Sequence, residues 1–365
     1  MYNWQRKEWP EFTYNVDELH EIAIVFAQEL GLVNGLFQGL NQALKREAML
    51  EIIISEAIKT SEIEGEYMSR EDIMSSIKNN LGITPSVIVK DKRAPGIAKL
   101  ILEVSQDINH TLTLEKMLSW HKILMEHDPK VNAGKWRTGA EPMQVVSGAY
   151  GRETVHYEAP PSENVPIEME NFMNWYRHSE LPAKDLISKA LLKSAVAHLY
   201  FESIHPFEDG NGRIGRALAE FTLAQGLKIP IFLSISKTIE QERNQYYHQL
   251  KSAQRSLDIT DWINYFAKII LDAQKETKAL IAFTLKKSKF FDQYGKQLNE
   301  RQLKAINRML ENGPDGFEGG MTAKKYIGIT KTSKATATRD LHQLYEWGIF
   351  VPEGAGRSVR YELIL

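Results

Sequence analysis

The stretch that decides the fold covers residues 205–216 and reads His205-Pro206-Phe207-Glu208-Asp209-Gly210-Asn211-Gly212-Arg213-Ile214-Gly215-Arg216. Its Gly-Asn-Gly turn leads into an apolar, alanine-containing run, which predicts a loop that enters a helix. The glycines allow backbone N–H groups to approach a ligand closely, and the N-terminus of a helix binds anions. The two arginines share one face of the first turn. The stretch therefore predicts an anion-binding helix start that carries two guanidinium groups.

Three more residues of this stretch have a predicted role. Asp209 can hold Mg²⁺, which usually binds one or two carboxylates together with waters and substrate phosphates. His205 precedes the loop and can act as a general base. Asn211 is a favourable N-cap residue. Together these parts suit a metal-bound polyphosphate beside a nucleophile that must lose a proton. The alternative is an ordinary helix terminator followed by an ordinary turn.

The composition fits a soluble globular protein: 365 residues, 43% hydrophobic and 25% charged. A net charge of -2 argues against general coating of nucleic acid. Because the chain has no cysteine, disulfides and thiolate chemistry are excluded, and any metal must be bound through oxygen or imidazole. The N-terminus lacks an apolar signal-peptide core, and the apolar runs are too short to cross a bilayer. We therefore expect a cytoplasmic protein that does not associate with membranes.

Helical periodicity dominates the first part of the chain. Apolar residues at helical spacing predict a helix over residues 17–31 that stops at Gly31, and a longer one over about residues 36–64 that stops at Gly65. Ser69 is the expected N-cap of the next helix. The sequence therefore predicts a mainly α protein.

A β-hairpin interrupts the largest helical block. Two short β-prone runs surround a glycine-containing turn within residues 145–157. From these patterns we expect four regions. They are a helical N-terminal extension (1–93), a core (94–278), a linker helix (279–298) and a C-terminal domain (299–365).

The C-terminal domain has a different pattern. Asn299 opens a capping box, Thr322 and Ser333 each precede a further helix, and residues 349–363 read as a hairpin. Three helices and a β-hairpin predict a winged helix-turn-helix. Its lysines and arginines suit a phosphate backbone, whereas winged helices also serve protein contacts. Contact with DNA or with a protein through residues 299–365 therefore remains open.

The stretch at 205–216 resembles the signature of the Fic family, His-x-Phe-x-(Asp/Glu)-Gly-Asn-Gly-Arg-x-x-Arg, and every defined position matches. The resemblance covers about residues 94–278. It implies an all-helical core with a β-hairpin flap, and a nucleotidyltransferase that moves AMP from ATP to hydroxyl side chains (Ser, Thr or Tyr) of target proteins. Doc toxins, the kinase-like relatives, have lysine where this chain has Gly212. Gly212 therefore favours nucleotidyl transfer over phosphotransfer.

The resemblance also assigns roles. It implies that His205 removes the proton from the target hydroxyl and that Asp209 coordinates a Mg²⁺ ion that bridges the α- and β-phosphates of ATP. The ATP phosphates would then lie against the loop and the start of the helix, in contact with Gly210, Asn211, Gly212, Arg213 and Arg216.

A second motif, residues 60–65, fits the family's inhibitory pattern (Ser/Thr)-x-x-x-Glu-(Gly/Asn). The resemblance implies that Glu64 pairs with Arg216, which would otherwise hold the γ-phosphate. A carboxylate 4 Å from that phosphate would repel it by roughly 4 kcal/mol at an effective dielectric constant near 20. By itself, Glu64 reads as a solvated charge at a helix end. Upstream of a full Fic signature, it is expected to inhibit.

Other ATP contacts follow from the resemblance. The hairpin 145–157 resembles the Fic flap, on which an unknown target protein would dock by edge pairing. Paired tyrosines recur in the family beside adenine and ribose, although a core position is equally expected for them here. Gln254 stands where several relatives have asparagine. The further expected ATP contacts are Val145, Val146, Ser147, Gly148, Tyr246, Tyr247 and Gln254.

The sequence thus predicts a protein adenylyltransferase that uses ATP and Mg²⁺ and is inhibited by Glu64. Two alternatives remain: removal of AMP from modified proteins on the same site, and a nucleotide-sensing regulator that binds DNA through residues 299–365. The target, dimerisation and the signal that relieves inhibition are left open.

Overall fold

The computed structural model describes residues 1–82, 88–147, 154–311, 313–354 and 359–365. These residues form two compact units: residues 1–31 with 49–275, and residues 32–48 with 276–365. The α-helices are α1 (Asp17–Gly39), α2 (Gln42–Ile63), α3 (Arg70–Asn80), α4 (Ala94–Gln106), α5 (Leu114–Met125), α6 (Val165–His178), α7 (Leu186–Ile204), α8 (Asn211–Leu227), α9 (Ile235–Gln241), α10 (Arg243–Ala253), α11 (Thr260–Tyr294), α12 (Glu300–Leu310), α13 (Ala323–Thr330) and α14 (Lys334–Glu346).

Short elements complete the fold. The strands form two antiparallel hairpins, so the predicted mainly α class, with one hairpin inside the core, is confirmed. These elements are the 3-10 helices η1 (Asn3–Gln5), η2 (Ser162–Asn164) and η3 (Gly313–Asp315), and the strands β1 (Gln144–Ser147), β2 (Thr154–Glu158), β3 (Phe350–Glu353) and β4 (Arg360–Leu363).

The first two helices differ from the prediction. The expected stop at Gly31 is wrong, because α1 continues to Gly39. Gly31 has open space around it and lies in ordinary helical backbone, so nothing ends the helix there. The second helix starts later than expected, where the Asn41 side chain accepts a hydrogen bond from the Leu44 amide at 3.0 Å. The side chain of Asn41, and not a glycine, therefore marks this boundary.

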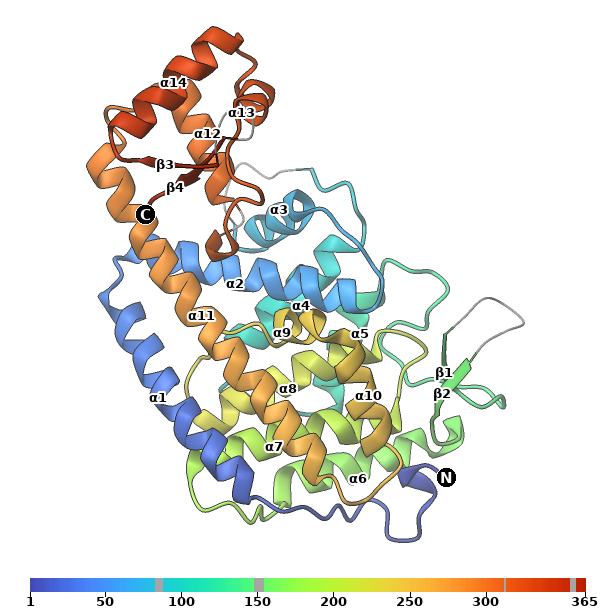
Figure 1. Cartoon of the computed structure of the whole chain (residues 1–365). Helices are drawn as coiled ribbons and strands as arrows, with labels where there is room; N and C mark the ends of the chain where they lie inside the picture. Colours follow the sequence, from blue (N-terminus) through green and yellow to red (C-terminus); the bar gives the residue numbers. More distant parts are fainter. Residues whose placement is uncertain (83–87, 148–153, 312, 355–358) are drawn as a thin grey trace. The chain divides into compact units, whose positions relative to one another are not determined.

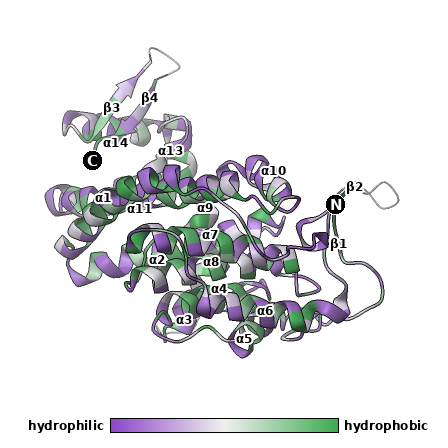
Figure 2. Ribbon diagram, turned by 90° about the horizontal axis from the view of Figure 1, so that it is seen from below, coloured by the Kyte–Doolittle hydropathy of each residue, from purple (hydrophilic) through white to green (hydrophobic). Residues whose placement is uncertain are grey.

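The centre of the larger unit is α7, which packs against α8 (Figure 1). Nearly all of α7 is buried from Ala190 to Ile204, with one apolar cluster on each side. Figure 2 shows hydrophobic segments where these two helices cross the unit. Because stretch 205–216 joins α7 to α8, the core fixes the loop at both ends.

The first hairpin projects from the larger unit beside the N-terminal arm, residues 1–16, which precede α1 (Figure 1). Val145 pairs with Tyr157, and a register shift follows before Val146. The Tyr157 hydroxyl donates to the Ser203 carbonyl at 2.5 Å, and the Trp4 indole N–H donates to the Glu158 carbonyl at 2.8 Å. Strand β2 is therefore attached to α7 and to the arm. The turn of the predicted flap, including Gly148, lies outside the described residues.

The smaller unit contains the predicted C-terminal helices and hairpin. The Asn299 capping box is present, and Thr322 and Ser333 cap α13 and α14 as expected. Asp340, which is buried, accepts hydrogen bonds from Arg301 at 2.8 Å and from the Tyr326 hydroxyl at 2.9 Å, and so ties α12, α13 and α14 together. That this arrangement is a winged helix remains a prediction.

One helix among the described residues, α1, is long and apolar enough to span a membrane by length and composition alone. The core helix of a soluble protein passes the same test, and four residues of α1, Leu19, Ile22, Ala23 and Phe26, lie in the core of the larger unit.

Candidate functional site

The site begins where α7 ends at His205. This residue has left-handed backbone (φ 51°), which non-glycine residues rarely adopt. Its N–H donates to the Phe201 carbonyl at 2.9 Å, and its carbonyl accepts from the Arg137 Nε at 2.7 Å. Arg137 is buried, and burial lowers its pKa to about 10. These contacts hold the His205 backbone in an unfavourable conformation, and the side chain lies at the edge of the core with 13% exposed.

The loop after His205 is closed by Asn211. The Asn211 side chain accepts from the Phe207 N–H and donates to the Phe207 carbonyl, both at 2.9 Å. The predicted N-cap role of Asn211 is wrong, because the N-cap of α8 is Gly210 and Asn211 is the first helical residue. Gly210 has φ 79°, and an added Cβ would lie 3.1 Å from Leu124 of α5. Glycine therefore suits this position both in conformation and in packing.

His121 of α5 contacts the loop that follows His205. Its Nδ1 accepts from the Gly134 N–H at 2.9 Å, so the remaining proton lies on Nε2, which donates to the Asp209 carbonyl at 3.2 Å. The imidazole stacks on Phe207 with 3.8 Å between ring centroids. Burial lowers the pKa of His121 to about 4, which keeps the ring neutral. His121 was not identified from the sequence, because Asp209, which accepts its hydrogen bond, is far away in the chain.

The predicted contact between Glu64 and Arg216 is present. Glu64 Oε1 lies 2.8 Å from an Arg216 terminal nitrogen. Arg216 also donates to the Thr60 hydroxyl at 2.8 Å and to the Thr60 carbonyl at 2.7 Å. Burial acts to lower the pKa of Arg216, but the charge of Glu64 outweighs it and raises the pKa overall. Arg216 therefore stays charged although only 1% of its side chain is exposed.

Glu64 also lies directly against the glycine turn. A Cβ added to Gly212 would be 2.1 Å from Glu64 Oε1. The carboxylate therefore lies over the backbone at the start of α8, where the N–H groups of a helix attract an anion. In this structure, an acidic side chain of the chain itself occupies the predicted anion site.

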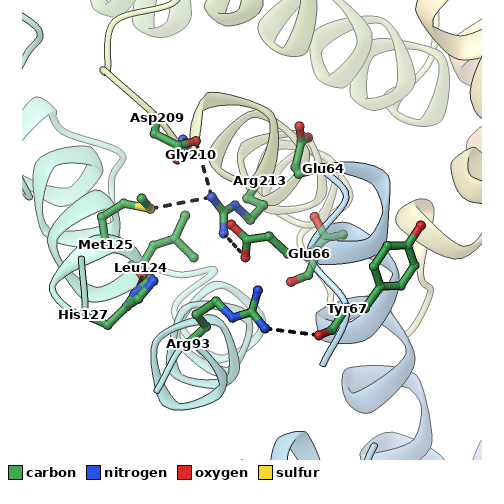
Figure 3. A network of polar contacts seen from close by, with 12 residues as sticks. Glu64, Glu66, Tyr67, Arg93, Leu124, Met125, His127, Asp209, Gly210 and Arg213 are labelled. Atoms are coloured by element: carbon green, nitrogen blue, oxygen red, sulfur yellow. Dashed lines mark hydrogen bonds and ion pairs between the residues drawn. The ribbon is translucent and has the colours of Figure 1, made fainter. Parts of the chain in front are cut away.

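The other arginine has a carboxylate partner that the sequence analysis missed. An Arg213 terminal nitrogen lies 2.7 Å from Glu66 Oε2, and the other lies 3.5 Å from Asp209 Oδ1 and 3.7 Å from the Met125 sulfur. Figure 3 shows the Arg213 guanidinium between these groups. The next residue along the segment, Tyr67, is held by Arg93, which donates to its carbonyl at 3.1 Å.

A cavity of about 720 Å³ opens beside these residues. Its walls come from α2, the first hairpin, the end of α7, the start of α8 and α10, and include Glu202 and Arg243. The predicted ATP contacts and catalytic residue on its walls are Glu64, Val145, Val146, His205, Gly212, Arg216, Tyr246, Tyr247 and Gln254.

The other predicted site residues lie elsewhere. Of those that the structure describes, Asp209, Gly210, Asn211 and Arg213 belong to the loop and first turn but not to the cavity wall. Ser147 ends strand β1. Gly148 is outside the described residues.

Comparison with known proteins assigns the fold. The Fic/DOC family model matches residues 111–223, which contain His121 and the stretch 205–216. A model described as a domain of unknown function (DUF4172) matches residues 2–83. Residues 111–223 therefore form a region similar to the Fic/DOC family.

Several Fic proteins resemble this chain. Protein adenylyltransferase Fic of Drosophila mojavensis is 26% identical over 230 residues, which are 62% of this chain and 41% of that protein. The chain thus spans about two fifths of the curated relatives it matches. A Fic family protein from Desulfovibrio desulfuricans shares the fold across 97% of this chain and 98% of its own (TM-score 0.57, 19% identity). A Fic domain containing signaling protein from Bacteroides thetaiotaomicron covers 71% of this chain and 97% of its own (TM-score 0.52, 17% identity).

Of the three cavity-lining residues predicted beside the nucleotide, Tyr246 and Gln254 are buried and Tyr247 is exposed. The Tyr246 hydroxyl lies 2.8 Å from His198 Nε2 in the core. The Gln254 side chain is buried and donates to the Glu202 carbonyl at 3.1 Å. Tyr247 is 38% exposed, and its hydroxyl donates to the carbonyl of Ile63 at the end of α2. Tyr247 is thus the exposed member of the pair.

Asp209 is the predicted Mg²⁺ ligand of the Fic loop. Its side chain is 56% exposed, and Oδ1 accepts from the Gly210 N–H at 2.5 Å. Within the described part of the chain, no three His, Asp or Glu side chains gather into a metal-binding cluster. A single exposed carboxylate beside an anion site still fits Mg²⁺, which can take its other ligands from phosphates and water.

Proposed function

We propose that this protein transfers AMP from ATP to a hydroxyl side chain of a target protein, and that Glu64 restrains the transfer. One observation carries the proposal: His205, Gly212 and Arg216 line a single cavity of about 720 Å³. A proton acceptor, a glycine that leaves room for an anion and a buried cation thus meet in a space of the size that small-molecule ligands occupy. The name of the Drosophila mojavensis relative, protein adenylyltransferase, supports this choice of reaction.

In the proposed reaction, the target oxygen forms a bond to the α-phosphorus of ATP and the bond to the pyrophosphate oxygen breaks. The hydroxyl proton passes to His205 and from there to water. The backbone N–H groups of Asn211 and Gly212 would face the phosphates. The Gly210 N–H already donates to Asp209 Oδ1, and the Asn211 side chain is bonded to Phe207. Such fixed donors stabilise the charge of the transition state without reorganisation.

Three further residues would stabilise the charge of the phosphates. Asp209 would hold Mg²⁺, which when bound supplies positive charge to the leaving pyrophosphate. Arg216 would bind the γ-phosphate once Glu64 leaves it, and Arg213 would add charge beside the loop. Transfer of this kind depends mainly on positioning and charge stabilisation.

The nucleoside and the target would occupy the remaining walls. Tyr247 and Arg243, whose guanidinium lies 5.7 Å from the Tyr247 ring centroid, would face the adenosine. Val146 and Val155, both well exposed, lie on the two strands of the first hairpin, where an extended target segment would dock. Edge pairing with β1 or β2 would bring the target hydroxyl toward His205.

The proposed inhibition acts by occupation of the site. Glu64 lies against Gly212 and pairs with Arg216, so a phosphate cannot approach either group until this carboxylate moves. A carboxylate that stays near the γ-phosphate would also repel it. ATP would therefore bind in an unproductive position, and any change that withdraws the end of α2 would activate the protein.

The experiment compares α-labelled with γ-labelled ATP in the presence of Mg²⁺ and cell lysate. The proteins are wild type, Glu64→Gly and Glu64→Gly/His205→Ala. We expect protein label from the α position only, strongest in Glu64→Gly and lost in the double variant. Label from the γ position would instead assign phosphotransfer.

A negative result has a defined meaning. If no variant labels protein although ATP binds, the same site would be tested for removal of AMP from a modified protein. The geometry offers Glu64, held beside Arg216, as the group that would orient a water molecule in that reaction.

We also propose that the smaller unit contacts DNA or a protein. Lys334 and Arg339 of α14 are exposed, as is Lys324 of α13, whereas Lys325 donates to the carbonyl of Gly320 at 3.0 Å and so belongs to the fold. A titration of the full chain with random duplex DNA at low and high salt tests the first possibility. Salt-dependent binding that Lys334→Ala/Arg339→Ala weakens would support it.

A further inference from the structure

A buried carboxylate lies next to the histidine that would act as the base. Glu202 belongs to the last turn of α7, and its Oε2 lies 3.7 Å from His205 Nδ1. Only 6% of the Glu202 side chain is exposed. Both residues line the cavity, so their contact lies at the wall where the target hydroxyl would be deprotonated.

Gly215 of α8, which has no side chain, leaves space for the Glu202 carboxylate. A Cβ added to Gly215 of α8 would lie 2.3 Å from Glu202 Oε1 and 3.2 Å from the His198 ring. Any larger residue at position 215 would press on the carboxylate. In the described structure, Glu202 Oε1 and His205 Nδ1 each lack a hydrogen-bond partner. A carboxylate and an imidazole nitrogen thus lie buried side by side, without other partners for these two atoms.

The charge of Glu202 is maintained in spite of burial. Burial acts to raise the pKa of Glu202, but His205, His198 and Arg216 outweigh it, and the pKa is lowered overall. A buried carboxylate without compensation would normally be neutral. At neutral pH, a negative charge therefore lies beside His205.

We propose that Glu202 is a positioning residue for His205: it accepts a hydrogen bond from Nδ1–H, leaves Nε2 free to receive the proton of the target hydroxyl, and stabilises the imidazolium that results. The inference rests on the proposed function, because it concerns His205 as the base. Neutral histidine carries its proton on either nitrogen, and a hydrogen-bond partner on one of them selects the tautomer.

The proton balance of the step is complete. As the target oxygen bonds to the α-phosphorus and pyrophosphate leaves, the hydroxyl proton moves to His205 Nε2. His205 then carries a positive charge, with the Glu202 carboxylate on its other side. Return of the proton from Nε2 to water restores the neutral ring. Glu202 keeps its charge throughout, so it needs no proton of its own.

Other ionisable groups face the pair. They are His198 of α7, Arg216 of α8, Tyr246 of α10 and Tyr157 of β2, and Glu64, which follows α2, lines the same cavity. Burial lowers the pKa of His198 and raises the pKa values of Tyr157 and Tyr246, so all three are neutral at neutral pH. Arg216 is paired with Glu64. Glu202 is therefore the negative charge that His205 meets at its Nδ1.

The test uses the full chain in the Glu64→Gly background, with Glu202→Gln as the variant and Glu170→Gln, an exposed residue of α6, as the control. We expect Glu202→Gln to lower kcat about a hundredfold, the lower end of general-base effects, with the KM for ATP little changed. Glu202→Asp should lie between the two.

A second readout does not need turnover. With ¹⁵N-labelled histidine, the His205 ring nitrogens report the tautomer by NMR, assigned against His205→Ala. We expect a predominantly Nδ1–H ring when Glu202 is present and a loss of this preference in Glu202→Gln. An unchanged tautomer, or an unchanged kcat, would overturn the proposal. If Glu64→Gly itself transfers no label, the adenylyl-transfer function fails, and the NMR readout still decides the role of Glu202.

Discussion

Two arginines of α8, Arg213 and Arg216, differ in the way residues 64–66, which follow α2, restrain them. Arg216 lines the cavity and is paired with Glu64, whose side chain is 30% exposed. Arg213 does not line the cavity: its guanidinium lies near Met125 of α5 and pairs with Glu66, whose side chain is 23% exposed. Gly65, with φ 81°, turns the chain between the two carboxylates.

Glu64 therefore blocks the cavity itself, whereas Glu66 anchors the segment that carries Glu64. Glu64 occupies space against Gly212, so its removal empties part of the cavity. Glu66 occupies no part of the cavity wall that the structure describes, but its contact with Arg213 fixes the segment that carries Glu64. We therefore expect the two carboxylates to affect transfer by different mechanisms and to different extents.

The largest effect is expected from Glu64→Gly. Loss of the carboxylate frees Arg216 and the helix start, and should raise the rate of AMP transfer by at least about tenfold, since a partly exposed charge is screened below its full Coulomb energy. Initial rates with α-labelled ATP measure the change. Glu64→Gln, which removes the charge but keeps the volume, should give a smaller rise.

Glu62→Gly is the matched control for that prediction. Glu62 lies in the last turn of α2, two residues before Glu64, but pairs with Lys59 at 2.7 Å. It carries the same glycine penalty at the helix end without touching either arginine. If Glu62→Gly activated as strongly as Glu64→Gly, fraying of α2 would explain activation, and the Glu64–Arg216 contact would not.

A smaller rise, about two- to fivefold, is expected from Glu66→Gln, because a partly exposed ion pair contributes up to about 1 kcal/mol. If Glu66 acts by anchoring Glu64, the substitution should have no effect in the Glu64→Gly background. Rates of wild type, both single variants and the double variant form the cycle. Equal effects in both backgrounds would show that Glu66 restrains Arg213 independently, and the distinction between blocking and anchoring would fail.

Much of this fold could be predicted because the signals are local. The caps at Ser69, Thr322 and Ser333 each depend on one side-chain oxygen and an N–H three residues later. The glycine stop at Gly31 failed, since a glycine in a helix costs only about 1 kcal/mol and packing outweighs it. Local rules thus placed caps better than they placed helix ends.

The sequence predicted less well which carboxylate pairs with which arginine or histidine in the site. The motif around residues 60–65 indicated Glu64, but the pairing of Glu66 with Arg213 depends on the turn at Gly65 and on the packing of α5. One signal for Glu202 was present, since it is the only acidic residue of α7 and precedes His205 by one turn. Its burial, which gives this pattern its meaning, becomes visible only in the folded chain.

The smallest effect on transfer is expected from two buried carboxylates, one on α2 and one on α8, that both bind the start of α9. Glu56 of α2 accepts from the Ser234 hydroxyl at 2.8 Å and from the Ser236 N–H at 3.0 Å, and Glu220 of α8 accepts from the Ile235 N–H at 3.1 Å. Neither Glu56 nor Glu220 lines the cavity. Burial, followed by the charge of Glu56, raises the pKa of Glu220 well above its usual value.

The sign of the pH effect follows from that shift. Because the pKa of Glu220 is higher in the folded than in the unfolded chain, its contribution to stability is complete below about pH 4.5 and is lost as the pH rises through the folded-state value. Glu220→Gln imitates the protonated form, so its thermal midpoint should match wild type at pH 5 and exceed it at pH 9, as calorimetry can measure. Glu170→Gln should show no such pH dependence. A variant destabilised equally at both pH values would mean that Glu220 is ionised in the fold, and that its charge is needed at this contact.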